Sequence, residues 1–155
     1  GYAVENLVVH DMVFAVRRQL DLEFANLRIE VRGSRIKGNI EGYYGVTCRF
    51  ADGQNYYAMV VGSDGWFGIG KKVLGLLTWL ASGKDTTAVH TGTAPNLIRA
   101  DCIGNKLVLW ANGVKVAEVE DDSFSAGSVG VLVGTRDKTG YEALFDDYKV
   151  YEPVR

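Results

Sequence analysis

The alternation of apolar and polar positions predicts β-strands along most of the chain. The clearest case is the segment 26–32 (NLRIEVR), in which Leu27, Ile29 and Val31 fall on one side of an extended chain and charged residues fall on the other. A strand with this pattern buries one face and exposes the other. We therefore expect it in a sheet that packs on a core with one side only.

The stretch 96–122 predicts three short strands in succession. Its apolar runs are separated by the pairs Gly104-Asn105 and Asn112-Gly113. Both pairs can adopt the positive φ angles that two-residue hairpin loops require. This part of the sequence therefore predicts an antiparallel meander.

Two other segments are informative. The apolar run 74–80 (LGLLTWL) fits a buried strand or a helical turn, and its position among strands favours a strand, with Trp79 in the core. The polar stretch 82–95 is expected to be a surface loop. In all, about eleven to thirteen strands at spacings of about 8 to 12 residues predict an all-β protein, an antiparallel sandwich of two sheets.

Composition agrees with this fold class and limits the partners. The 155 residues include 19 glycines and 2 prolines, and 47% are hydrophobic, as in a folded chain rich in tight turns. We expect one domain over 1–155, processed or excised from a larger secreted protein. A net charge of −2 argues against a nucleic-acid partner, and no apolar run approaches the roughly 20 residues that membrane insertion requires.

The two cysteines, Cys48 and Cys102, both fall on the apolar side of their predicted strands. Spacing alone leaves two interpretations open. They are either two buried free thiols or a disulfide, and a disulfide would imply an oxidising compartment.

Several segments occur in an order that resembles a known superfamily. They are EGYYGVTCRFADGQNYYAMVVGSDGWFGIGK, NLIRADCIGNKLVLWANGVKVAEVED, SVGVLVGT and ALFDDYKVYEP. The chain resembles the concanavalin A-like lectin/glucanase (laminin-G-like) superfamily, and its nearest branch is that of bacterial 3-keto-disaccharide hydrolase and glycoside hydrolase family 16-like domains.

This resemblance implies a jelly-roll β-sandwich, an extracellular location, secreted or on the cell surface, and a ligand that is a glycan. It also implies a bridge between Cys48 and Cys102. Because such domains often hold a structural calcium ion through one carboxylate and backbone oxygens, Asp146 is the candidate calcium ligand. No other cofactor is expected.

The sequence does not predict an enzyme. A retaining glucanase needs two carboxylates about 5 Å apart, in a pattern such as E-x-D-x-x-E, and this pattern is missing. Glu118 and Glu120 share one side of a strand, but a solvated strand end explains them better. His10 and His90 lack the spacing of metal ligands.

Sugar rings stack on exposed aromatic side chains, and nearby polar groups bond their hydroxyls. Trp66 alternates away from the core side and lies beside two glycines, which would leave its ring uncovered. The predicted ligand-binding residues are Trp66, Tyr56, Arg49, Arg99, Asp101 and Trp110, and we expect them to share one surface.

Three functions follow in order of preference. The first is a non-catalytic extracellular module that binds a glycan or another surface ligand. The second is a structural or adhesion subunit that self-associates through edge strands, because unpaired strand edges recruit other chains. The third is a divergent sugar hydrolase.

Overall fold

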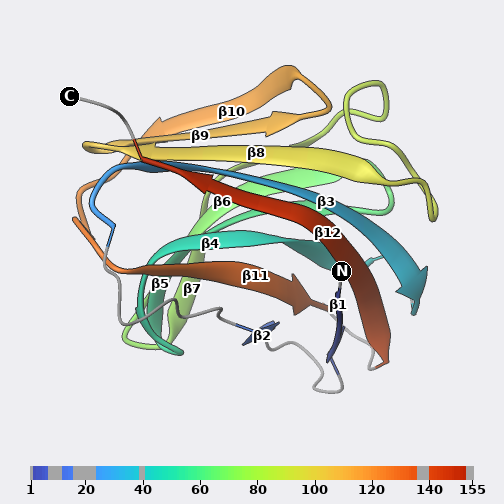
Figure 1. The fold of residues 1–155 in the computed structure, drawn as a ribbon, viewed down its shortest axis with the longest axis horizontal. Helices are drawn as coiled ribbons and strands as arrows, with labels where there is room; N and C mark the ends of the chain where they lie inside the picture. The colour runs from blue at the N-terminus through green and yellow to red at the C-terminus, as the bar shows by residue number, and fades with distance from the viewer. Residues whose placement is uncertain (1, 7–11, 16–23, 39–40, 136–139, 153–155) are drawn as a thin grey trace.

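Two antiparallel sheets of six strands each form the fold, which was obtained as a computed structural model that describes residues 2–6, 12–15, 24–38, 41–135 and 140–152 (Figure 1). Sheet A has the order β1 (Tyr2–Asn6), β12 (Tyr141–Tyr151), β3 (Leu27–Lys37), β8 (Asn96–Ile103), β9 (Lys106–Ala111), β10 (Val114–Glu120). Sheet B has the order β2 (Met12–Ala15), β11 (Ser128–Gly134), β4 (Tyr43–Asp52), β5 (Asn55–Gly62), β6 (Trp66–Val73), β7 (Leu76–Lys84). The predicted antiparallel β-sandwich is confirmed.

Strand β3 has the predicted alternation. Leu27, Ile29 and Val31 are fully buried between the sheets, and the residues between them point away from the core. The strand continues to Lys37, five residues beyond the predicted end, because it pairs with β12 along this stretch. Pairing with β12 thus extends β3 through a segment whose glycine and polar residues had predicted the end of the strand.

The predicted meander is confirmed as β8, β9 and β10. Gly104 has a φ of 60° in the first turn, and Asn112 and Gly113 have φ angles of 52° and 84° in the second. The side-chain oxygen of Asn112 also accepts a hydrogen bond from the Leu97 amide at 2.8 Å. Turn chemistry that is visible in the sequence therefore sets the register of these strands.

The ambiguous run 74–80 contributes strand β7, which pairs with β6. Trp79, which was expected in the core, is partly buried against a second apolar cluster on the side of sheet B that faces away from sheet A. The loop is also shorter than predicted, because the pairing with β6 continues to Lys84. Ala88 and Val89 of this loop are buried, so it closes one end of the core.

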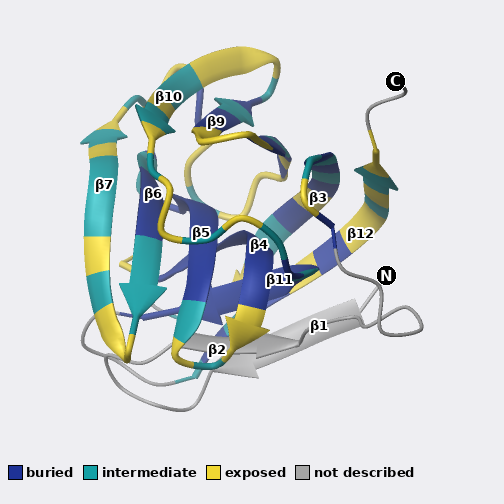
Figure 2. Cartoon of the chain, turned by 90° about the vertical axis from the view of Figure 1, so that its left-hand side faces the viewer, coloured by how far each residue is buried: buried dark blue, intermediate teal, exposed yellow. Residues whose placement is uncertain are grey.

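The core lies between the two sheets and is crossed by a disulfide. Cys48 of β4 and Cys102 of β8 are fully buried and bonded to each other, with their Cα atoms 6.8 Å apart. The bridge that the resemblance implied is therefore present, and it ties sheet A to sheet B. Figure 2 shows that β4 and β5, in the middle of sheet B, are buried along most of their length, whereas β7 at its edge is not.

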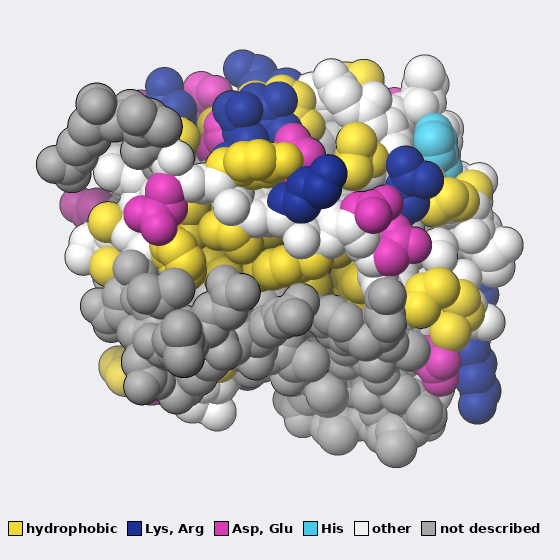
Figure 3. Space-filling model, viewed as in Figure 1, with side chains coloured by type: hydrophobic (Ala, Val, Ile, Leu, Met, Phe, Trp, Pro, Cys, Tyr) yellow, Lys and Arg dark blue, Asp and Glu magenta, His cyan; other side chains and the backbone are white. Residues whose placement is uncertain are grey.

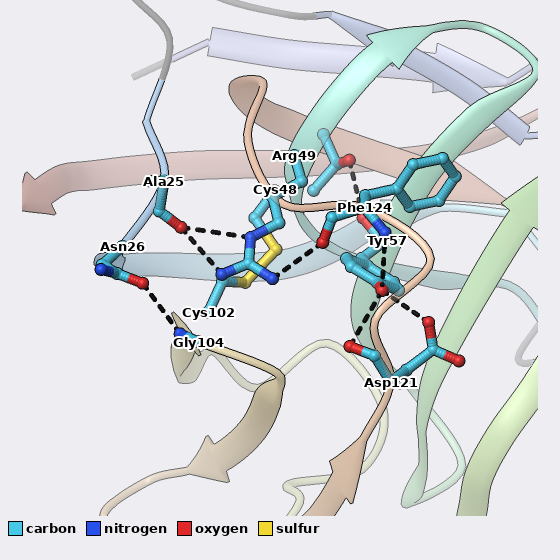
Figure 4. The surroundings of a disulfide bond; sticks show 10 residues. Ala25, Asn26, Cys48, Arg49, Tyr57, Cys102, Gly104, Asp121 and Phe124 are labelled. Carbon is cyan, nitrogen blue, oxygen red and sulfur yellow. Dashed lines mark hydrogen bonds between the residues drawn. A yellow bond between two sulfur atoms is a disulfide. The ribbon is translucent and has the colours of Figure 1, made fainter.

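The segment after β10 is held beside this disulfide by a hydrogen-bond network (Figure 4). The Asp121 carboxylate accepts hydrogen bonds from the Tyr57 hydroxyl at 2.6 Å and from the Lys71 ammonium at 2.8 Å. Burial alone would raise the pKa of Asp121, but these bonds and those from Ser123 outweigh it and hold that pKa well below its usual range. Burial also raises the pKa of Tyr57 to about 12. The carboxylate therefore fastens the end of sheet A to β5 and β6 of sheet B.

Candidate ligand-binding site

The outer face of sheet A, the side turned away from the core, carries a cluster of paired charges. Arg28 of β3 lies opposite Asp101 of β8 in the strand register. Its guanidinium donates two hydrogen bonds to the Asp101 carboxylate, at 2.8 and 3.0 Å, and this pairing raises the pKa of Arg28. Asp101 is 7% exposed. Its bidentate salt bridge holds the Arg28 guanidinium in one orientation.

Trp110 of β9 lies beside this pair. The guanidinium carbon of Arg99 lies 3.9 Å from the centroid of the Trp110 ring, and that of Arg28 lies 6.0 Å from it. The Arg99 Nε is 3.9 Å from the Asp101 carboxylate. Because Arg99 stacks on the ring of Trp110, this tryptophan orients the two arginines more than it offers a free stacking surface.

An open cleft adjoins this cluster. It has a volume of about 340 Å³ and is lined by Arg28, Glu30, Ile103, Tyr151 and Glu152. Tyr151 is 46% exposed and Ile103 is 41% exposed. The cleft thus combines an exposed aromatic ring and an apolar side chain with a fixed guanidinium and two carboxylates.

A second hollow continues from the first. It measures about 350 Å³ and is lined by Asp101, Ile103, Asn105, Lys106 and Val108. Ile103 lines both hollows, and Asp101 holds the arginine of the first. In the upper half of Figure 3, where β8 to β10 lie in Figure 1, basic, acidic and apolar side chains are exposed side by side. This mixture suits a polar ligand that also has apolar faces.

The outer face of sheet B carries an aromatic cluster instead. The rings of Trp66 and Trp79 meet edge to face with their centroids 4.8 Å apart, and each lies within 5.6 Å of the Tyr43 ring. Gly68 leaves the space that these rings occupy, since a Cβ atom there would lie 2.6 Å from Trp66. The sequence correctly places Trp66 on this side, but its neighbours partly bury it.

Tyr56 lies on the same face and is fully buried, stacked on Phe50 with the ring centroids 5.7 Å apart. The expectation that Tyr56 contacts a ligand is therefore wrong. Alternation along β5 does turn its side chain away from the core, but the side chains of a second apolar cluster enclose it. Strand alternation identifies a face without revealing whether that face is covered.

The expectation for Arg49 is also wrong, since this residue is 2% exposed. Its guanidinium donates two hydrogen bonds to the Ala25 carbonyl, at 3.1 and 2.8 Å, and one to the Phe124 carbonyl at 2.9 Å. Burial lowers the pKa of Arg49. The residue has a φ of 49°, where the register of β4 shifts, so simple alternation does not hold there.

The six predicted residues therefore do not form one surface. Arg99, Asp101 and Trp110 lie together on sheet A, whereas Trp66 lies on sheet B. The cleft residues that the sequence did not single out are Arg28, Glu30 and Tyr151. Their outward positions on β3 and β12 are readable from alternation, but the pairing of Tyr151 with Arg28 depends on the sheet order.

The other acidic candidates lie elsewhere. Glu118 is on the edge strand β10, with its carboxylate 3.4 Å from the Lys115 ammonium. Asp146 is exposed on β12, opposite Arg32. Over the ranges that the structure describes, no three His, Cys, Asp or Glu side chains gather where they could hold a metal ion. The calcium ion expected at Asp146, which would be held by one carboxylate and backbone oxygens, stays a prediction.

Comparison with known proteins identifies the fold. The sequence matches no protein-family model and no curated protein. Among solved structures, the carbohydrate-binding module CBM66 from Bacillus subtilis is similar over 94% of this chain and 94% of that module, with a TM-score of 0.72 and 15% identity. CG-16, a homodimeric agglutinin from chicken liver, is similar over 91% of this chain and 100% of its own, with a TM-score of 0.61 and 11% identity.

A third similar structure is the GH43 protein BlXynB from Bacillus licheniformis, with a TM-score of 0.63 and 15% identity. The similar region covers 87% of this chain and 28% of the BlXynB chain. These likenesses show that the chain has a β-sandwich fold of the kind found in a carbohydrate-binding module and an agglutinin. At such low identities they establish the fold alone, and nothing in them supports the narrower branch that the sequence resembles.

The part of the chain that the structure describes contains no helical segment with the length and hydropathy of a membrane span.

Proposed function

We propose that the protein is a non-catalytic, extracellular glycan-binding module and that its sugar site is the cleft lined by Tyr151, Arg28 and Glu30. The observation that carries this proposal is the composition of that cleft. An exposed tyrosine ring gives a sugar an apolar surface, while a guanidinium and two carboxylates offer hydrogen-bond donors and acceptors for its hydroxyls.

The rigidity of the site supports the same proposal. Asp101 holds the Arg28 guanidinium before any ligand arrives, and Arg99 and Trp110 pack beside it. Binding then requires little ordering of side chains, which lowers its entropic cost. The volume of about 340 Å³ is at the lower end of the range for small-molecule sites, which fits a ligand of one or two sugar rings.

The fold comparisons add support, because one similar structure is a carbohydrate-binding module and another is an agglutinin. The extracellular location rests on the disulfide between Cys48 and Cys102, since such bonds persist in oxidising compartments. The non-catalytic assignment rests on the sequence, which lacks the paired carboxylate motif of the glucanases. Membership of the bacterial branch named above remains a prediction.

A glycan-array screen, with and without calcium, followed by titration calorimetry on the hits tests the proposal. We expect specific hits, and we expect Tyr151→Ala to weaken binding by about tenfold or more, because it removes the stacking surface. Trp66→Leu is the matched comparison on sheet B and should leave the affinity unchanged. Loss of binding in Trp66→Leu alone would move the site to sheet B, and the absence of any hit would refute the proposal.

One observation favours a second candidate function, that of a structural or adhesion subunit. Strand β7 is an outer edge of sheet B. Leu74, in the turn before β7, is 87% exposed, and Leu76, the first residue of β7, is 71% exposed. An unpaired apolar edge can pair with the edge of a second chain. Light scattering at micromolar concentration tests this function, and a Leu76→Lys variant should dissociate any oligomer that uses this edge.

A further inference from the structure

A third cleft lies further along the outer face of sheet A. It has a volume of about 330 Å³ and is lined by Arg32, His90, Pro95, Leu97 and Asn112. Arg32 is on β3, two residues beyond Glu30 of the proposed sugar site, and both side chains point away from the core. Two residues of a strand span about 6.6 Å, so the two clefts are neighbours on one surface.

Hydrogen bonds fix the walls of this third cleft. The side chain of Asn96, which is fully buried, accepts hydrogen bonds from the His90 amide and from the Asn112 side chain, both at 2.8 Å. It also donates to the Tyr44 hydroxyl at 2.8 Å. The His90 Nδ1 lies 2.9 Å from the Pro95 carbonyl oxygen, so Nδ1 donates and the ring has one orientation.

The lining of this cleft includes basic side chains and no acidic one. Arg32 and His90 are the ionisable residues of its lining, and the lining includes no carboxylate. Asp146 lies opposite Arg32 in the strand register, yet Arg32 makes no ion pair with any residue in the described ranges. The guanidinium is exposed and available to a ligand. The proposed sugar site, by contrast, is lined by Glu30 and Glu152.

We infer that the His90 cleft binds an anionic substituent, a carboxylate or a sulfate ester, on the glycan whose rings occupy the Tyr151 cleft. This inference rests on the proposed function and adds a ligand class to it. A guanidinium binds such groups through paired hydrogen bonds, and the Glu30 and Glu152 carboxylates repel them from the opposite end. The glycan is therefore acidic at one end and bound in one direction.

The test is a titration with two matched tetrasaccharides, one that carries a uronic acid and its carboxyl-reduced counterpart, together with inorganic sulfate alone. We expect the wild-type protein to bind the acidic form about tenfold more tightly. Arg32→Ala should abolish this preference and keep the affinity for the reduced form, whereas Tyr151→Ala should weaken both. Because the site is at the surface, the preference should shrink at 1 M salt.

Lys84→Ala is the matched control, because it removes one exposed positive charge from the other sheet and should preserve the preference. Equal affinity for the two tetrasaccharides, or an equal effect of Arg32→Ala on both, would overturn the inference and leave the glycan-binding function standing. Binding of sulfate without either tetrasaccharide would reduce the cleft to a simple anion site. If the wild-type protein binds none of the three probes, the inference fails, and the glycan-array screen decides the proposed function separately.

Discussion

Replacing the buried Arg49 by methionine gives a direct test of what holds the sandwich closed beside its disulfide. The guanidinium makes three hydrogen bonds to the carbonyls of Ala25 and Phe124, which lie in two different loops. Methionine has a similar length but cannot donate, so both carbonyls lose their partner. It also keeps a β-carbon at the positive φ of this residue, so the backbone strain is the same in both proteins.

The expected cost follows from these contacts. A buried group that loses its hydrogen-bond partner costs about 1 to 3 kcal/mol, and Arg49→Met leaves the carbonyl of the half-buried Phe124 without its donor. Ala25 is exposed, so water can reach its carbonyl, and the variant avoids the cost of burying a charge. We therefore expect a loss of about 2 kcal/mol, which corresponds to a fall of about 4 to 8 °C in Tm for a chain of this length.

Urea unfolding under oxidising conditions, followed by tryptophan fluorescence, measures this change with the disulfide intact. Arg32→Met is the matched control, because it makes the same chemical change at an exposed position and should alter the free energy of unfolding by less than about 0.5 kcal/mol. The reasoning is refuted if the two variants have the same stability. The hydrogen bonds from Arg49 to the two loops would then make no net contribution to the free energy of unfolding.

Three further predictions concern stability. Removing the disulfide through the double variant Cys48→Ala/Cys102→Ala should cost about 4 kcal/mol in the chain-entropy model, and chemical unfolding of both proteins measures this. The Asp121 pKa is lower in the folded protein than its unfolded-state pKa of about 3.9, so the ionised carboxylate stabilises the fold above that pH. Stability should therefore fall as the pH drops through about 4 and below. Asp121→Asn should weaken this pH dependence in acid titrations followed by circular dichroism. Leu74→Gly should stabilise the protein by up to about 1 kcal/mol, because a φ of 50° is strained for leucine. Leu76→Gly is the control and should destabilise the protein. Thermal unfolding of both variants measures the difference.

Much of the fold was predictable because local chemistry and global structure agree. The alternation in β3 and the turn pairs Gly104-Asn105 and Asn112-Gly113 each specify a short element, and both positions of the disulfide fall on apolar faces. These features depend on side-chain period and on φ preferences, which a sequence displays directly.

The candidate site depends on long-range pairing, and for this reason the sequence could not assemble it. Tyr151 meets Arg28 only because β12 pairs with β3, and Arg28 meets Asp101 only because β8 pairs with the other edge of β3. The separation of Trp66 from Asp101 has the same origin, since alternation gives the side of a strand but not the sheet to which the strand belongs.

The sequence by itself determined the strands, their tight turns and the face of most side chains. Tertiary structure alone decided which outward faces are covered, as for Tyr56, and where a register shift turns a residue inward, as for Arg49. The physical reason is that burial and strand order are set by contacts between segments far apart in the chain. Those contacts gather the Tyr151 and His90 clefts on one surface of sheet A.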